Sequence, residues 1–102
     1  MKPLFIPLIK KYFEDFAAGK KKIELRRYGK RWNEKTCTVG REVVLSCGYG
    51  KKNRLRGRIC KFRKQCGTAF SPGYQNDIRQ VYGSVEIDIA CLSIADIEPL
   101  SA

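Results

Sequence analysis

The residues best suited to chemistry lie in one short run, Gly19 to Arg26, with the sequence GKKKIELR. Apolar Ile23 and Leu25 alternate there with charged residues, which is typical of a strand with one buried face, so Glu24 and Arg26 share the opposite face about 7 Å apart. A carboxylate acceptor beside a fork-shaped guanidinium donor can read a nucleobase edge and a phosphate or amide. A Glu–Arg ion pair in solvent, worth at most about 1 kcal/mol, is the competing interpretation.

A second run, Tyr28 to Trp32 (YGKRW), interleaves aromatic rings with cations. Rings stack on bases and cations neutralise phosphates, so this composition suits nucleic-acid binding. Alternatively Trp32, the only tryptophan, closes one end of the core while Arg31 stacks on its ring.

A third run, Ser46 to Lys52 (SCGYGKK), precedes three arginines at alternate positions from 54 to 58. Glycines on both sides of Tyr49 allow a backbone to approach a ligand closely, and N–H groups in such turns can cradle an anion. Two of the arginines can instead form cross-strand ion pairs with acidic residues of a later strand. The four residues of that alternative are Arg56, Arg58, Glu86 and Asp88.

The chain is strongly basic, and its charge is uneven. Its 102 residues carry 21 Lys and Arg against 10 Asp and Glu, a net charge of +11. Residues 1–70 hold 20 of the basic and 5 of the acidic side chains, whereas residues 71–102 hold 1 and 5. A positive field that belongs to one part of the fold favours a polyanion as the partner, and solubility alone is the alternative.

The chain has no histidine and has five cysteines at irregular spacings, Cys37, Cys47, Cys60, Cys66 and Cys91. Without a C-x-x-C pair or a histidine we expect neither a structural metal nor a cofactor. The odd count excludes a fully paired disulfide framework and favours reduced thiols in a cytosolic protein. Any acid–base chemistry therefore falls to Lys, Glu, Asp or Tyr.

Hydrophobic periodicity in the first part of the chain predicts a strand, a helix and a second strand. Leu4 to Ile6 is typical of a short buried strand, and Pro7 suits the first turn of a helix over about residues 8–18, whose aromatic stripe faces the core. Gly19 stands where a left-handed C-cap is expected. A strand over residues 22–26 follows, and residues 28–38, which have no period, are predicted to form a loop.

The rest of the chain predicts more strands and one helix. We expect a strand at 43–45, a turn at 47–53, a strand at 54–62 with a bulge at Gly57, a loop at 65–73 and a short helix at 74–82. Val85 to Ile89 is the cleanest strand pattern, and a final apolar stretch covers 92–97. This order indicates one small α+β domain, residues 1–102, around a mostly antiparallel sheet or open barrel. The apolar stretch at 3–9 is too short for a membrane span or a signal peptide, so we expect a soluble, cytoplasmic protein.

The run from Gly19 to Arg26 resembles the G-[KR]-K-[ST]-x-E-x-R signature of ASCH domains, which belong to the larger PUA-like group. The likeness continues in order through RYG at 27–29, RWNE at 31–34, VGR at 39–41 and LSCGYG at 45–50, followed by Arg54-Leu55. It covers roughly residues 3–62. This looks like a compact ASCH subgroup that phages and prophages often encode, which would place the protein in the host cytoplasm.

The resemblance implies a small PUA-like open β-barrel with one to three short helices and a cleft. The signature residues that would project into it are Lys21, Glu24 and Arg26, and the implied ligand is RNA or a modified nucleoside. Some small ASCH proteins are similar to amidohydrolases that deacetylate N4-acetylcytidine with a lysine, a threonine nucleophile and a distant glutamate. Lys21 matches that lysine, whereas Glu24 replaces the threonine, and no matching glutamate lies between residues 65 and 82.

Our leading hypothesis is therefore a binding module for RNA, a nucleoside or a nucleotide, with no metal or membrane partner, as a monomer or weak dimer. The predicted ligand-binding residues are Lys21, Glu24, Arg26, Tyr28, Arg31, Trp32, Ser46, Tyr49, Lys51 and Arg54, with Lys52 also steering phosphates. A metal-independent hydrolase of a modified nucleoside or of RNA is the alternative, with Glu24 as general base, Lys21 or Arg26 stabilising an oxyanion and Asp77 or Tyr49 assisting. A phage protein that binds a host protein is the third.

Overall fold

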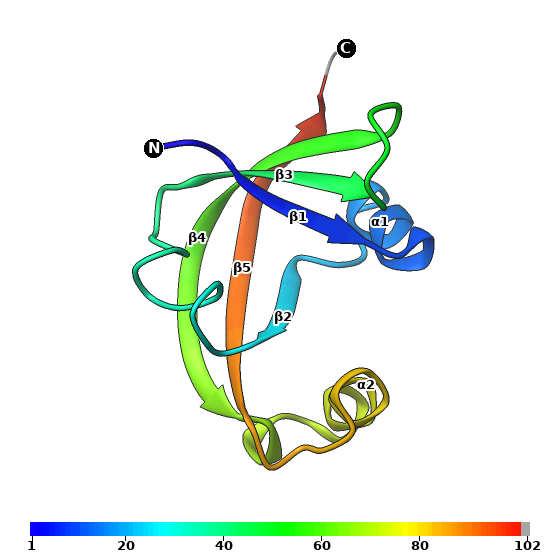
Figure 1. Ribbon diagram of the computed structural model, residues 1–102. Coiled ribbons are helices and arrows are strands. Elements are labelled where there is room, and N and C mark those ends of the chain that lie inside the picture. Colours follow the sequence, from blue (N-terminus) through cyan, green and yellow to red (C-terminus); the bar gives the residue numbers. More distant parts are fainter. Residues whose placement is uncertain (101–102) are drawn as a thin grey trace.

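A curled five-stranded sheet forms the body of the protein in the computed structural model, which describes residues 1–100 (Figure 1). The strands follow the order β1-β3-β4-β5-β2, with β1 parallel to β3 and the other three pairs antiparallel. They span β1 Leu4–Leu8, β2 Ile23–Arg27, β3 Glu42–Cys47, β4 Arg54–Cys66 and β5 Asp88–Pro99. The edge strands β1 and β2 are not paired with each other, so the barrel stays open at a seam between them. The predicted α+β open barrel is confirmed.

The first helix, α1, spans Lys10–Ala17 and begins later than predicted. Pro7 lies inside β1 and not in the first turn of the helix, which corrects the sequence interpretation. Proline fits there because β1 is an edge strand, paired on one side only. The predicted left-handed cap is confirmed: Gly19 has φ +77°, and the Lys20 N–H donates to the Asp15 carbonyl at 2.8 Å.

The central strand β4 extends to Cys66, further than its apolar pattern indicated. Its register against β5 shifts between Arg56 and Arg58, which confirms the predicted bulge at Gly57. A Cβ at Gly57 would lie 2.7 Å from the Ile94 Cγ2, so the two strands approach each other closely here. This approach leaves room only for glycine.

The second helix, α2, spans Pro72–Tyr82 and follows a 3-10 turn at Gly67–Ala69. The helix predicted over 74–82 is thus confirmed, with its start two residues earlier, and the loop predicted over 65–73 shrinks because β4 and α2 take its ends. Gly83, with φ +81°, ends the helix.

The strand predicted at Val85 to Ile89 is wrong for its first three residues. β5 begins at Asp88 and absorbs the final apolar stretch in one long strand. Val85 and Ile87 alternate like strand residues because they pack against the cluster under α2, where the Ile87 carbonyl accepts the Gly67 N–H at 2.8 Å. The alternation of apolar and polar residues at 85–87 therefore reflects the packing of side chains against this cluster and not the pairing of a strand.

Two apolar clusters hold the fold together. The larger one joins β1, β3, β4 and β5 to α1 and to the loop at 28–41, in which residues 28–38 are irregular as predicted. The smaller one lies where α2 and the 3-10 turn meet the β2–β5 ladder, and it contains Phe70, Ile78, Ile89 and Cys91. α2 is thereby attached beside the edge strand β2, which leaves it next to the seam of the barrel.

The arginines of β4 have other partners than the predicted Glu86 and Asp88. Arg56 forms an ion pair with Glu98, and the Arg58 Nη1 donates to the Gly40 carbonyl at 2.8 Å. The Asp88 carboxylate lies 3.9 Å from the Lys64 Nζ. Arg56 does have an acidic cross-strand partner, but the register between β4 and β5 places Glu98, which comes later in the chain, opposite it.

No helix within residues 1–100 is long and apolar enough to cross a membrane.

Candidate functional site

A cleft of about 370 Å³ opens at the seam, with β2 as its floor. The two helices lie at opposite ends of β2 in Figure 1, and both contribute walls. The lining residues are Pro7, Leu8, Ile9, Tyr12, Lys21, Glu24, Leu25, Arg26, Tyr74, Asp77, Ile78, Gln80, Val81 and Tyr82. The volume falls within the range of small-molecule sites in proteins.

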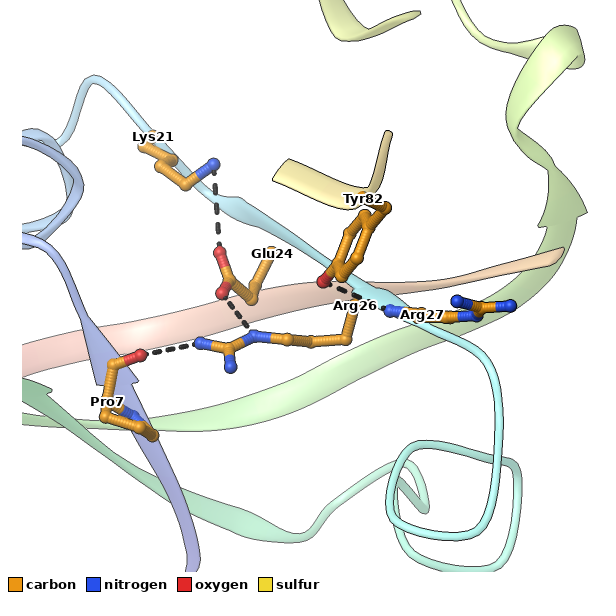
Figure 2. A network of polar contacts seen from close by, with 6 residues as sticks. All are labelled: Pro7, Lys21, Glu24, Arg26, Arg27 and Tyr82. Atoms are coloured by element: carbon orange, nitrogen blue, oxygen red, sulfur yellow. Dashed lines mark hydrogen bonds and ion pairs between the residues drawn. The ribbon is translucent and has the colours of Figure 1, made fainter. Parts of the chain in front are cut away.

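Arg26 bridges the seam of the barrel (Figure 2). Its Nε donates to the Glu24 Oε2 at 2.7 Å, and its Nη2 donates to the Pro7 carbonyl of β1 at 2.6 Å. The guanidinium also lies 4.8 Å from the centre of the Trp32 ring. Arg26 therefore connects the two unpaired edges of the sheet and fixes one oxygen of Glu24.

Glu24 is buried, with 5% of its surface exposed. The interpretation of Glu24 and Arg26 as an ion pair in solvent is therefore wrong. Burial raises the pKa of Glu24, while the Arg26 and Lys21 charges and the Leu25 amide oppose the shift. The folded protein consequently binds this proton more readily than the unfolded chain does.

Lys21 is held beside the second oxygen of Glu24. Its Nζ lies 3.9 Å from the Glu24 Oε1, 4.9 Å from the centre of the Tyr12 ring and 5.6 Å from that of Phe16. A separation of 3.9 Å is an ion pair but exceeds a hydrogen bond. The Nζ protons and the Oε1 lone pairs therefore keep the capacity to bind a ligand that enters between them.

The wall formed by α2 is attached to β2 through Tyr82, whose hydroxyl accepts the Arg27 N–H at 3.2 Å (Figure 2). Nearer the start of the same helix, Tyr74 and Asp77 line the cleft. Burial, followed by the negative charges of Asp77, Glu24 and Asp15, raises the pKa of Tyr12 on the facing wall. The mouth of the cleft is thus both aromatic and charged.

Three tyrosines of the cleft were not predicted as site residues. The sequence interpretation assigned Tyr12 to the core, and it assigned no role to Tyr74 and Tyr82. The sequence contained a usable signal, because Tyr12 directly follows Lys10 and Lys11 and so adjoins the polar side of its helix. The packing of the helices determines which of their faces adjoin the seam, and hydrophobic periodicity does not predict that packing.

The remaining predicted residues lie elsewhere. Trp32 is 9% exposed within the larger apolar cluster, and the Arg31 guanidinium lies 5.3 Å from its ring centre. The alternative interpretation, in which Trp32 belongs to the core and Arg31 stacks on it, is therefore confirmed. The Tyr28 hydroxyl donates to Glu34, and the Lys64 Nζ lies 4.3 Å from the Tyr28 ring centre. None of the three predicted residues in this loop, Tyr28, Arg31 and Trp32, lines the cleft with Lys21 and Glu24, although the Trp32 ring contacts the Arg26 guanidinium.

The β3–β4 hairpin holds the rest of the predicted set, and none of it lines the cleft. Ser46 is buried and its Oγ donates to the Gly50 carbonyl at 3.1 Å, whereas Tyr49 is 80% exposed. Lys51 and Lys52 are exposed, and the Arg54 guanidinium lies 5.4 Å from the Phe5 ring centre. The predicted residues therefore divide into a cleft group, a group in the loop that follows β2 and a hairpin group.

Within residues 1–100, no three Cys, Asp or Glu side chains come together as a metal site would require. Lys21, Glu24 and Arg26 offer hydrogen bonds and charge. Their arrangement can bind a polar, planar group, and the Glu24 Oε1 can accept a proton from a bound molecule.

No known family model matches the chain, and no curated protein does. Solved structures do. The chain is similar to the ASCH protein of Zymomonas mobilis, with a TM-score of 0.67, 13% identity and coverage of 93% of this chain and 68% of that one. A tyrosine-to-phenylalanine variant of that protein gives a TM-score of 0.69 at 13% identity, covering 99% and 74%. The hypothetical protein PH0355 gives 0.64 at 18% identity, covering 97% and 100%. This chain therefore has the fold of the Zymomonas mobilis ASCH protein, as its sequence motifs implied.

Proposed function

We propose that the cleft binds a nucleobase, presented by RNA or by a nucleotide. The observation that carries the proposal is the contact of Lys21 and Arg26 with the buried Glu24 at the floor of a cleft with tyrosine walls. The likeness of the Gly19 to Arg26 run to the ASCH signature, and the fold, support the same ligand class.

The polar atoms of the floor suit the edge of a base. Glu24 and Pro7 engage two of the five Arg26 N–H groups, and beside them at the floor lie the Lys21 Nζ as donor and the Glu24 Oε1 as acceptor. A ring N–H beside a ring nitrogen or carbonyl oxygen is complementary to this pair. Tyr12 and Tyr74 offer aromatic faces at the walls.

A second hollow, of about 460 Å³, adjoins the cleft and shares Tyr12, Lys21, Tyr74 and Asp77 with it. Lys11, Lys20 and Lys22 add positive charge to it, and Asp15 adds one negative charge. The excess of cations fits a phosphate linked to the bound base. A nucleotide is therefore expected to bind more tightly than its nucleoside.

Calorimetric titration with the four ribonucleosides, their monophosphates and short single-stranded RNA at low salt tests the proposal. Lys21→Ala is expected to weaken binding at least about 10-fold, the scale of one charge-assisted hydrogen bond. Lys35→Ala, at an exposed position of the loop at 28–41, is the matched control and should bind as the unmodified protein does. Absence of binding to every ligand in the panel would refute the proposal.

A hydrolase is the second candidate, because burial raises the pKa of Glu24 beside a lysine. In that case Glu24 removes a proton from water and Lys21 stabilises the oxyanion. Asp77 can assist because it lines the cleft, whereas Tyr49 does not line it. Turnover of an acylated nucleoside or of RNA by the unmodified protein, lost in Glu24→Gln with nucleoside binding retained, is the expected result. A panel without turnover contradicts this candidate and leaves the binding proposal intact.

A further inference from the structure

The hairpin between β3 and β4 presents an aromatic ring to solvent. Tyr49 is 80% exposed, and its ring centre lies 6.1 Å from that of Phe5 on β1, with 35° between the ring planes. So exposed a ring buries little apolar surface, and its packing contributes little to the stability of the hairpin. The Tyr49 ring, with the partly buried Phe5 ring beside it, is therefore available for contact with another molecule.

Positive charge surrounds the two rings. Residues 47–54 contain Lys51, Lys52 and Arg54 and no acidic residue. Arg54 lies over the Phe5 ring, 5.4 Å from its centre, and both lysines are exposed. Aromatic rings flanked by cations are complementary to the bases and phosphates of a single strand of nucleic acid.

The hairpin is held in place by its backbone. Gly48, with φ +70°, donates its N–H to the Leu8 carbonyl at 2.9 Å. The Gly50 carbonyl accepts from the Ser46 Oγ at 3.1 Å and from the Arg54 Nε at 3.2 Å. Because these contacts fix the turn, little conformational entropy is lost when a base stacks on Tyr49.

We propose that Tyr49 and Phe5 form a stacking platform for one base of single-stranded nucleic acid, distinct from the cleft, with Lys51, Lys52 and Arg54 contacting its phosphates. Phe5 is two residues from Pro7, a cleft residue, which separates their Cα atoms by about 7 Å along β1. One strand can therefore occupy the platform and the cleft together. Only this continuity rests on the proposed function of the cleft.

The test measures fluorescence anisotropy of labelled single-stranded RNA and DNA of about eight nucleotides, a length within the site sizes of such surfaces. Tyr49→Ala is expected to weaken binding of the oligonucleotide about 5- to 160-fold, the range for loss of one stacked base, and Tyr49→Phe should retain it. Lys51→Ala with Lys52→Ala should lower the dependence of log affinity on log salt by about 1.4. Val39→Ala, at another exposed apolar side chain outside the hairpin, is the control.

The outcomes separate the platform from the cleft. Oligonucleotide binding that Tyr49→Ala leaves unchanged overturns the platform, as does duplex RNA that binds as tightly as the single strand. Loss of oligonucleotide affinity in Tyr49→Ala with mononucleotide affinity unchanged supports it. Loss of oligonucleotide affinity in Tyr49→Ala but not in Lys21→Ala supports the platform and refutes the continuity of the bound strand with the cleft, while mononucleotide titration still decides the cleft proposal. Absence of all oligonucleotide binding overturns the platform, whatever mononucleotides do.

Discussion

Replacing Arg26 with alanine removes the side chain that bridges the seam of the barrel. The change breaks the hydrogen bonds to the Glu24 Oε2 and the Pro7 carbonyl, removes the contact with Trp32, and leaves the Glu24 carboxylate buried with Lys21 as its nearest cation. Loss of one partner of a buried ion pair costs about 3–5 kcal/mol. We expect the free energy of unfolding to fall by about 3 kcal/mol, the lower end of this range, because the Arg26 side chain is 20% exposed to solvent.

Urea unfolding at neutral pH measures this loss, and two further variants test its cause. Arg56→Ala is the matched control, since Arg56 also pairs with a glutamate but both side chains are about half exposed, 51% and 52%. It should cost at most about 1 kcal/mol. Adding Glu24→Gln to Arg26→Ala removes the uncompensated charge and should recover about 1–2 kcal/mol.

A loss below about 1 kcal/mol in Arg26→Ala would refute the argument, because the pair would then behave like one in solvent. Strictly additive losses in the double variant would refute the attribution to a stranded buried charge.

Three further predictions concern four variants. Because the pKa of Glu24 is raised in the folded state, the unfolding free energy should fall as pH rises above the ordinary glutamate pKa of about 4.3, and Glu24→Gln should remove that slope in unfolding series at several pH values. Gly67→Ala places a Cβ 2.4 Å from the Val85 carbonyl oxygen and should cost at least about 2 kcal/mol, whereas Gly73→Ala in α2, with no atom within 4 Å, should stabilise by up to about 1 kcal/mol in thermal unfolding. Tyr82→Phe should cost at most about 1 kcal/mol and speed amide exchange of Arg27, which unchanged exchange would contradict.

Local signals predicted much of the fold. The alternation of charged and apolar residues in β2, the glycine at the end of α1 and the bulge at Gly57 are each determined by a few neighbouring residues. The failures are all long-range. Pro7 is tolerated in β1 because that strand is at the edge, and Arg56 meets Glu98 because β5 is one long strand with its own register.

The sequence by itself determined that Glu24 and Arg26 share one face of a strand, with Lys21 just before it. Only the tertiary structure decided that this face is buried at the seam, that Arg26 reaches a carbonyl on β1, and that the tyrosines of two distant helices surround it. It also separated the Tyr49 hairpin from the cleft. The physical reason is that strand periodicity specifies which side chains point the same way, whereas the packing of other elements specifies what that face meets.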